Sequence, residues 1–182
     1  MRIVAGFFKG RSLLEFKGEN VRPTLDMARE SLFNIIKDKV VNADFLDLYC
    51  GTGAVGIEAL SRGAKSVAFN DVSRDSINLT KKNLEKVDKE KIVNVGKNVI
   101  FYNYDATVFL TSVNKKFDII FIDAPYGTKN IDNVIIACER ILNENGIIIF
   151  EDQQSCELQL ENLVLYDKRK YGRAHFSFFK KA

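Results

Sequence analysis

The sequence predicts an α/β fold: a seven-stranded, mostly parallel sheet with helices on both faces and an antiparallel hairpin at its C-terminal end. Between residues 45 and 150, five short apolar runs alternate with segments of helical periodicity, which is typical of a parallel sheet. Two further β-rich runs, at about 162–169 and 174–180, flank Tyr171-Gly172-Arg173 and indicate the hairpin. The 182 residues, 46% of them hydrophobic, suffice for one domain with a sizeable core.

The chain begins with a basic segment that we predict to extend the main domain. Residues 1–24 are predicted to form a small β-hairpin and a loop, and residues 25–182 the main domain. Phe7 and Phe8, within the hairpin, either stack on single-stranded nucleic acid or, as is more common, pack the hairpin onto the domain.

The first predicted helix covers about residues 25–39, where apolar residues recur with helical spacing. Arg29 and Glu30, near its start, are interpreted as surface residues. Gly63 ends the next helix, and the helix after that is amphipathic. The later elements are a strand from Phe45, a helix to about Arg62, strands at 66–71, 99–105, 119–122 and 146–150, and helices at 74–87, about 106–113 and 131–142.

A glycine-rich turn separates the strand that begins at Phe45 from its helix. The turn contains the pattern G-x-G-x-x-G, formed by Gly51, Gly53 and Gly56. Glycines let a backbone approach a ligand closely, and the first N–H groups of the next helix are free to bind one. Dinucleotide-binding proteins share this pattern, so it does not identify the ligand by itself. Asp47, just ahead of the glycines, would repel a pyrophosphate but could hold an amino group.

Acidic residues end each of the first four predicted strands, and the carboxyl ends of parallel strands meet at the edge of the sheet where ligands bind. S-adenosylmethionine suits this edge because it has a cationic amino-acid end, a ribose and an adenine amine but no phosphate. Asp47 suits the methionine end and Asp71 the ribose hydroxyls. Asp105 suits the adenine N6, with the Ala106 N–H at adenine N1. Each acid alone could be a turn former, whereas four in register favour the cofactor. The predicted cofactor site comprises Asp47, Tyr49, Gly51, Thr52, Gly53, Asp71, Asp105, Ala106 and Asp123.

The apolar run at 119–122 ends in Asp123-Ala124-Pro125-Tyr126. The run has the length of a buried strand, and Pro125 ends it. A carboxylate, a backbone carbonyl and an aromatic ring would then lie together at the edge of the sheet. They could bind a flat ring that carries an amine, through two hydrogen-bond acceptors and one stacking face. These four residues are the predicted catalytic residues, and the alternative is an ordinary polar turn after a strand.

The net charge of +3 is unevenly distributed along the chain. Residues 1–24 carry five Lys or Arg against two Glu, and residues 166–182 carry six against one Asp, so the middle of the chain is acidic. Basic ends favour a polyanion, although solvated termini would carry the same charges. The residues predicted to contact this polyanion are Arg2, Lys9, Arg11, Arg22, Lys168, Arg169, Lys170 and Arg173.

The composition argues against several other classes of protein. No apolar run approaches the roughly 20 residues that a membrane span needs, and the polar start does not match a signal peptide. Cys50, Cys138 and Cys156 are odd in number and form no CxxC pair, so neither a zinc site nor a disulfide framework is predicted. We therefore expect a cytoplasmic monomer without a metal.

These motifs resemble the bacterial RsmD family. The resemblance is carried by residues 1–11, Arg22-Pro23-Thr24, residues 30–35, 47–56 and 58–64, the acids at 71 and 105, residues 123–126 and Tyr171-Gly172. It implies a class I S-adenosylmethionine-dependent methyltransferase with a Rossmann-like fold. Its substrate would be the exocyclic N2 of a guanine in 16S ribosomal RNA, free or in a small-subunit assembly particle. The chain departs from the family at Ala124, where the substrate motif has a proline, and at Asp71, where glutamate is commoner.

The resemblance also implies a mechanism. The guanine leaves the RNA stack and enters the pocket, where Tyr126 stacks on it. Asp123 and the carbonyl of Ala124 accept hydrogen bonds from N2 and turn its lone pair towards the methyl group. Three alternatives remain: a nicotinamide-dependent dehydrogenase, a non-catalytic RNA-binding domain, and a methyltransferase that acts on adenine N6 or a protein amide.

Overall fold

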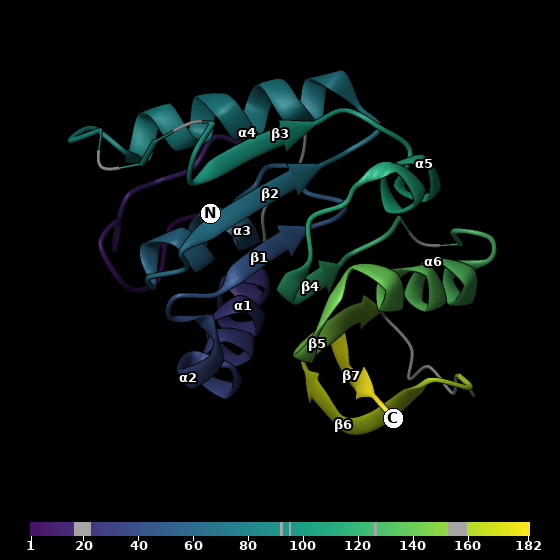
Figure 1. The fold of residues 1–182 in the computed structure, drawn as a ribbon. Coiled ribbons are helices and arrows are strands. Elements are labelled where there is room, and N and C mark those ends of the chain that lie inside the picture. The colour runs from purple at the N-terminus through teal and green to yellow at the C-terminus, as the bar shows by residue number, and fades with distance from the viewer. Residues whose placement is uncertain (17–22, 92, 95, 126, 153–159) are drawn as a thin grey trace.

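In the described part of the chain, seven strands form one sheet in the order β3-β2-β1-β4-β5-β7-β6 (Figure 1). The computed structural model describes residues 1–16, 23–91, 93–94, 96–125, 127–152 and 160–182. The strands are β1 Asp44–Asp47, β2 Ser66–Asn70, β3 Val99–Tyr102, β4 Phe117–Ile122, β5 Leu142–Asp152, β6 Leu163–Tyr171 and β7 Ala174–Lys181. β1 to β5 are parallel, and β7 is antiparallel to both of its neighbours, β5 and β6. The predicted mostly parallel sheet with an antiparallel C-terminal hairpin is confirmed.

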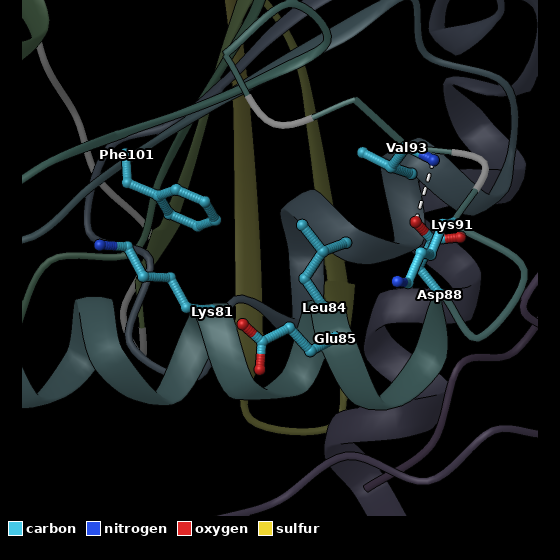
Figure 2. A pocket seen from close by; sticks show the side chains of 7 residues that line it. All are labelled: Lys81, Leu84, Glu85, Asp88, Lys91, Val93 and Phe101. Atoms are coloured by element: carbon cyan, nitrogen blue, oxygen red, sulfur yellow. Dashed lines mark hydrogen bonds between the residues drawn. The ribbon is translucent and has the colours of Figure 1, made fainter.

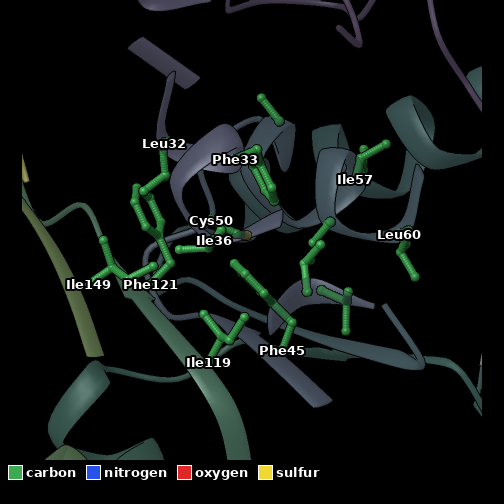
Figure 3. Packing of buried hydrophobic residues seen from close by; sticks show 14 of the residues in the cluster. Leu32, Phe33, Ile36, Phe45, Cys50, Ile57, Leu60, Ile119, Phe121 and Ile149 are labelled. Atoms are coloured by element: carbon green, nitrogen blue, oxygen red, sulfur yellow. The ribbon is translucent and has the colours of Figure 1, made fainter. Parts of the chain in front are cut away.

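Helices cover both faces of this sheet. The helices are α1 Pro23–Ile35, α2 Lys37–Val40, α3 Ala54–Ser61, α4 Arg74–Val87, α5 Ala106–Ser112, α6 Ile131–Cys138 and the 3-10 helix η1 Glu139–Ile141. On one face, apolar side chains of α1 and α3 pack with Phe45, Phe121 and Ile149 of the strands (Figure 3). Side chains of α4 belong to the same core. On the other face, α5 and α6 pack over Leu46 and Ile120. Successive residues of the central strands therefore enter opposite cores, which is why these strands are apolar throughout.

The order of the strands reverses between β1 and β4, which are neighbours in the sheet. The helix after β1 lies on one face and the helix after β4 on the other. Beyond the strands, the N–H of Leu48 donates to the carbonyl of Phe121 at 3.0 Å, and the N–H of Cys50 donates to the carbonyl of Asn70 at 3.0 Å. In open α/β sheets, ligands bind in the crevice outside the carboxyl ends at such a switch point.

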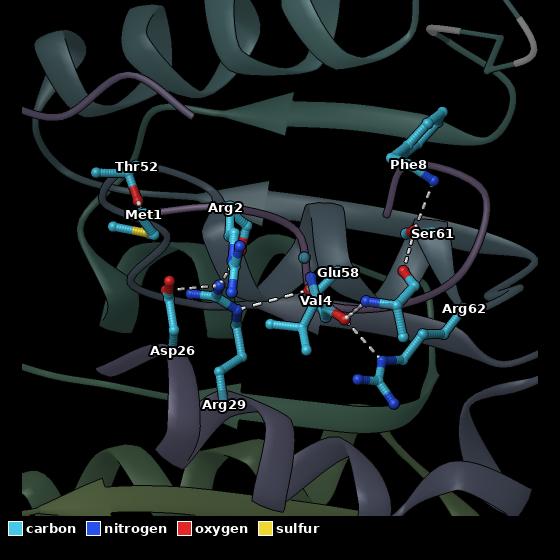
Figure 4. A network of polar contacts seen from close by, with 12 residues as sticks. Met1, Arg2, Val4, Phe8, Asp26, Arg29, Thr52, Glu58, Ser61 and Arg62 are labelled. Atoms are coloured by element: carbon cyan, nitrogen blue, oxygen red, sulfur yellow. Dashed lines mark hydrogen bonds and ion pairs between the residues drawn. The ribbon is translucent and has the colours of Figure 1, made fainter. Parts of the chain in front are cut away.

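The N-terminal segment is anchored to α3 by hydrogen bonds from its backbone N–H groups to side chains of that helix (Figure 4). The carboxylate of Glu58, which is fully buried on α3, accepts from the N–H groups of Val4 at 2.8 Å and Ala5 at 3.0 Å. One turn later, the hydroxyl of Ser61 accepts from the N–H of Phe8 at 2.9 Å. A buried carboxylate needs such donors, so Glu58 and the segment hold each other in place.

The predicted N-terminal hairpin is only partly present. Residues 1–16 contain a single antiparallel bridge, between Arg2 and Ser12, and no pair of regular strands. The reason is that the segment directs the N–H groups of Val4 and Ala5 to α3 instead of to a partner strand. Of the aromatic pair, Phe8 is 2% exposed and packs onto the domain, as the commoner alternative predicts, whereas Phe7 is 71% exposed and does not.

The helix predicted over residues 25–39 is two helices. α1 ends at Ile35, and Ile36, with φ −96° and ψ 11°, separates it from α2. α1 begins at Pro23, which suits a first helical turn because proline lacks an N–H and that N–H would be unpaired there. The boundary drawn at residue 24 thus falls within α1, and the division into two regions stays a prediction. Of the described residues, no helix is long and apolar enough to cross a membrane.

Candidate active site

A cavity of about 780 Å³ opens at the carboxyl ends of β1 to β5. The predicted site residues in its wall are Asp47, Tyr49, Gly51, Thr52, Asp71, Asp105, Asp123, Ala124 and Pro125. Gly53 and Ala106 are not among the wall residues, and Tyr126 lies outside the described residues. The volume falls within the usual range for small-molecule sites.

The three glycines of the turn have different physical roles. Gly53 has φ 77°, and a Cβ there would lie 2.4 Å from Cγ2 of Thr80. A Cβ at Gly56 would lie 2.3 Å from the ring of Phe69. Gly51 has φ 52°, but no atom lies within 4 Å of the position its Cβ would take. Gly53 and Gly56 are therefore required by packing, whereas Gly51 leaves its backbone open to the cavity.

The side chain of Asn70 joins the loops that follow β1, β2 and β3. Its amide nitrogen donates to the carbonyls of Leu48 at 3.2 Å and Tyr104 at 3.1 Å. Its amide oxygen accepts from the N–H of Tyr104 at 3.3 Å. Asn70 is fully buried, so these bonds satisfy it and fix the spacing of the loops that carry the acids. The sequence analysis did not identify this residue.

Asp47 lies at the floor of the cavity and is 2% exposed. Its carboxylate accepts a hydrogen bond from the N–H of Gly56 at 2.9 Å. The pKa of Asp47 is raised to about 7, mainly by burial, which outweighs the Gly56 hydrogen bond and is aided by the charges of Asp123 and Asp71. A cation in the cavity would favour the ionised form.

Asp71 and Asp105 organise the loops beside the cavity. The two carboxylate oxygens of Asp71 accept from the N–H groups of Gly51 at 3.0 Å and Ser73 at 2.8 Å. Asp105 caps α5, accepting from the N–H of Thr107 at 2.8 Å. The Thr107 hydroxyl and N–H lower the pKa of Asp105, so this carboxylate is ionised at neutral pH. A carboxylate has about four acceptor positions, so both acids can still accept from a ligand.

Asp123 and Ala124 follow β4 and differ in exposure. The carboxyl group of Asp123 is open to the cavity but surrounded by protein on its other sides, and this desolvation raises its pKa to about 6. The side chain of Ala124 is buried in the core beneath α5 and α6. The carbonyl of Pro125 accepts from the N–H of Thr128 at 3.0 Å.

Comparisons with known proteins identify the family. The family described as Conserved hypothetical protein 95 matches residues 1–180. The chain belongs to this family. It is 31% identical to Ribosomal RNA small subunit methyltransferase D of Haemophilus influenzae over 185 residues, which are 99% of this chain and 93% of the relative. The solved structure of yhhF from Escherichia coli has a TM-score of 0.85 at 28% identity, over 100% of this chain and 97% of that one. SMU.776, solved as a complex with SAH, shares the fold with a TM-score of 0.70 at 17% identity, over 88% of this chain and 50% of that one.

The predicted membership of the RsmD family and the class I methyltransferase fold are therefore confirmed. This member of the family is an S-adenosylmethionine-dependent methyltransferase. The cavity fits such a donor, because carboxylates with spare acceptor positions surround it and Gly51 adds no side chain to its wall.

Arg29 belongs to the cavity wall, although the sequence analysis took it for a surface residue. It is 6% exposed, and one of its terminal nitrogens donates to Asp26 at 3.0 Å and to the carbonyl of Arg2 (Figure 4). Its Nε lies 3.7 Å from the carboxylate of Glu58. The helical spacing could have predicted that Arg29 is buried. Arg29 is three residues before the buried Leu32 and so lies on the same face of α1.

Glu151 is the second wall residue that was missed. It lies near the end of β5, and the sequence analysis noted it only as an acid at a strand end. Burial, and after it the charge of Asp123, raises the pKa of Glu151 to about 8 against the opposing charge of Arg29. The sign of this effect could not be inferred from the sequence, because it depends on which charges the fold places nearby.

The predicted RNA-contacting residues form two separate groups. Arg2 and Lys9 are exposed on the N-terminal segment, and Arg22 lies outside the described residues. Arg11 is already paired, since its guanidinium donates to the two carboxylate oxygens of Glu90 at 2.7 and 2.8 Å. The second group lies at the outer edge of the sheet, on β6 and in the turn after it, and consists of the exposed residues Lys168, Arg169, Lys170 and Arg173.

A smaller hollow of about 360 Å³ lies between α4 and β3 (Figure 2). Its apolar lining includes Leu84 and Phe101, and Nζ of Lys81 lies 5.3 Å from the centre of the Phe101 ring. At its far end, the carboxylate of Asp88 accepts from the N–H of Val93 at 2.9 Å. None of the predicted site residues line this hollow.

Proposed function

We propose that this enzyme transfers a methyl group to the exocyclic N2 of a guanine in 16S ribosomal RNA. One observation carries the proposal: the carboxyl group of Asp123 and the chain at Ala124 lie in the same cavity as the strand-end acids Asp47, Asp71 and Asp105. An acceptor pair for an amine and a set of acceptors for a methyl donor are thereby adjacent. The name of the Haemophilus influenzae relative supports small-subunit ribosomal RNA as the substrate.

On the donor side, each acid has a proposed partner. S-adenosylmethionine supplies an activated methyl group when it is bound. Asp71 accepts from the ribose hydroxyls, and Asp105 accepts from the adenine amine next to the Ala106 N–H. Asp47 holds the amino group of the methionine end. Its raised pKa supports this assignment, because a buried carboxyl group gains most from a cationic partner.

On the acceptor side, Asp123 and the backbone carbonyl of Ala124 each accept one N–H of the guanine N2. Both hydrogens are then directed away from the donor, so the nitrogen lone pair faces the methyl group. The contribution of these residues is orientation, because an amine can release its proton after transfer without a strong base. Asp123 has a pKa of about 6, so it is mostly an ionised acceptor at neutral pH. Tyr126 is proposed to stack on the base.

The RNA is proposed to contact the basic groups of the N-terminal segment and of β6. Residues 1–24 would then act as an extension on the RNA side of the methyltransferase domain. The proposed RNA contact of the exposed cations of β6 is supported by their position at the outer edge of the sheet, where a large ligand can approach. This substrate implies a cytoplasmic enzyme, which we expect to act as a monomer.

The proposal is tested by mass spectrometry of ribosomal RNA nucleosides from cells with and without the gene. We expect the loss of one N2-methylguanosine in 16S ribosomal RNA. Loss of N6-methyladenosine instead would favour the adenine alternative, and an unchanged nucleoside profile would contradict the proposal.

Variants of the purified protein test the assigned acceptor. Asp123→Ala should lower methyl transfer by at least about a hundredfold, the usual effect of removing one positioned polar group from an active site. Asp132→Ala is the matched control, because Asp132 is an exposed acid on α6 outside the cavity. An Asp123→Ala protein that methylates as fast as the parent would contradict the acceptor assignment. In a thermal-shift titration, S-adenosylhomocysteine should stabilise the protein and NAD should not.

A further inference from the structure

Asp123 and Glu151 lie side by side at the ends of neighbouring parallel strands. Ile122 of β4 pairs in register with Phe150 of β5. The residues that follow them, Asp123 and Glu151, are therefore adjacent. Neighbouring strands are about 4.8 Å apart, which places the two carboxyl groups within reach of one molecule. Both side chains line the cavity.

The two carboxyl groups also project to the same face of the sheet. Phe121 and Ile149, two residues before them, enter the core beneath α1 and α3 (Figure 3). Side chains alternate along a strand, so Asp123 and Glu151 project to this face as well. Arg29 of α1 is close enough to lower the pKa of Glu151, which agrees with this placement.

Two acids this close do not both ionise readily, and one proton remains on the pair near neutral pH. Burial and the charge of Asp123 raise the pKa of Glu151 to about 8, against the opposing charge of Arg29, whereas that of Asp123 is about 6. The proton therefore resides mainly on Glu151. Among the described residues, none donates a hydrogen bond to the Glu151 carboxyl group, so its acceptor and its donor are available to a ligand.

A neutral carboxyl group is complementary to the guanine edge next to N2. Guanine presents the N1–H donor and the O6 acceptor side by side, and a carboxylic acid offers one acceptor and one O–H donor with matching spacing. We propose that Glu151 selects guanine by accepting from N1–H and donating to O6 while Asp123 and Ala124 hold N2. This inference rests on the proposed methylation of guanine N2 and assigns Glu151 as a residue that determines specificity for the base.

The test compares guanine with 2-aminopurine at the target position of a 16S ribosomal RNA fragment. 2-Aminopurine keeps the N2 amine but lacks both the N1–H and O6. A site built to bond these groups rejects the analogue, so kcat/KM for the wild-type protein should be at least about tenfold higher for guanine. The ratio of the two kcat/KM values is the readout, because a merely structural defect lowers both by the same factor.

Two substitutions then isolate the role of Glu151. Glu151→Met keeps the length of the side chain without hydrogen bonding, so the ratio should fall to about one. Glu151→Gln keeps one acceptor and one donor, so the ratio should stay within about threefold of the wild-type value. A wild-type ratio in Glu151→Met, or an equal loss for both substrates in both variants, would overturn the inference while leaving guanine methylation intact. If the wild-type protein methylates no guanine in the fragment, the proposed function itself fails.

Discussion

The carboxylate of Asp47 accepts a hydrogen bond of 2.9 Å from the N–H of Gly56, across the glycine-rich turn. The acid ahead of the glycines therefore has a structural partner at the start of α3 as well as a place in the cavity wall. The N–H of Gly56, in the first turn of α3, is therefore already hydrogen-bonded within the protein. The turn is held in shape without a ligand, and open space lies beside Gly51, where no atom is within 4 Å of the position that a Cβ would take.

The pH dependence of stability should depend on Asp47. Its pKa in the folded protein, about 7, lies above that of an unfolded aspartate, so the folded state holds the proton more tightly. The stability that this contributes is present at acid pH and is lost as the pH rises through about 7. Asp47→Asn should remove this part of the pH dependence, up to about 4 kcal/mol between pH 4 and 8, and leave the parts due to Asp123 and Glu151. Urea denaturation across this range measures it.

The control for this prediction is Asp105→Asn. The Thr107 hydroxyl and N–H lower the pKa of Asp105 below that of an ordinary aspartate, so its titration adds no slope near neutral pH. Asparagine also remains a good helix cap. The same slope in Asp47→Asn as in the wild-type protein would show that Asp47 does not carry the effect.

Gly53→Ala should destabilise the protein strongly. A residue with a Cβ at φ 77° costs about 1–3 kcal/mol by itself, and the new methyl group would lie 2.4 Å from Cγ2 of Thr80. Gly10→Ala is the control, because Gly10 has φ 80° but nothing within 4 Å of its Cβ position. Thermal denaturation should show a larger loss for Gly53→Ala, partly recovered by adding Thr80→Ser. Equal losses of thermal stability in Gly53→Ala and Gly10→Ala would mean that the Thr80 side chain moves to make room for the new methyl group at little cost.

Removal of the Glu58 carboxylate should detach the N-terminal segment from α3. Glu58 is fully buried and accepts from Val4, Ala5 and Arg62, so Glu58→Ala leaves these donors unpaired and should cost about 3–5 kcal/mol. Hydrogen exchange at the amides of Val4 and Ala5 should be faster in Glu58→Ala than in the wild-type protein. Glu90→Gln is the control, because Glu90 is an exposed acid in an ion pair with Arg11. It should lower the free energy of unfolding much less than Glu58→Ala. Unchanged exchange at Val4 and Ala5 would argue against the anchor.

RNA binding should weaken with salt through the cations of β6. Replacing Lys168, Arg169 and Lys170 by glutamine should reduce the slope of log K against log salt by about 0.7–0.9 for each phosphate that the protein no longer neutralises. Lys81→Gln is the control, because Lys81 lies over Phe101 of β3 at the opposite edge of the sheet. Fluorescence anisotropy with a ribosomal RNA fragment measures the slope. A triple variant with the wild-type slope would remove these residues from the interface.

The sequence predicted the sheet and the acids at its edge because both depend on local patterns. Apolar runs broken by Asp47, Asp71, Asp105 and Asp123 place carboxylates at strand ends whatever the detailed packing. The N-terminal segment was harder to predict. Its backbone donors bond to Glu58, which is more than 50 residues away in the chain, and no local pattern reports such a partner.

The sequence by itself thus determined the mostly parallel sheet with its antiparallel C-terminal hairpin, the glycine turn and the family. The tertiary structure alone decided that Arg29 enters the cavity and that Glu151 stands beside Asp123. It also decided that Arg11 is already paired with Glu90. The physical reason is that a strand or a turn follows from neighbours in the chain. The protonation and availability of a charged side chain depend instead on burial and on other charges, which only the folded chain brings within a few ångströms.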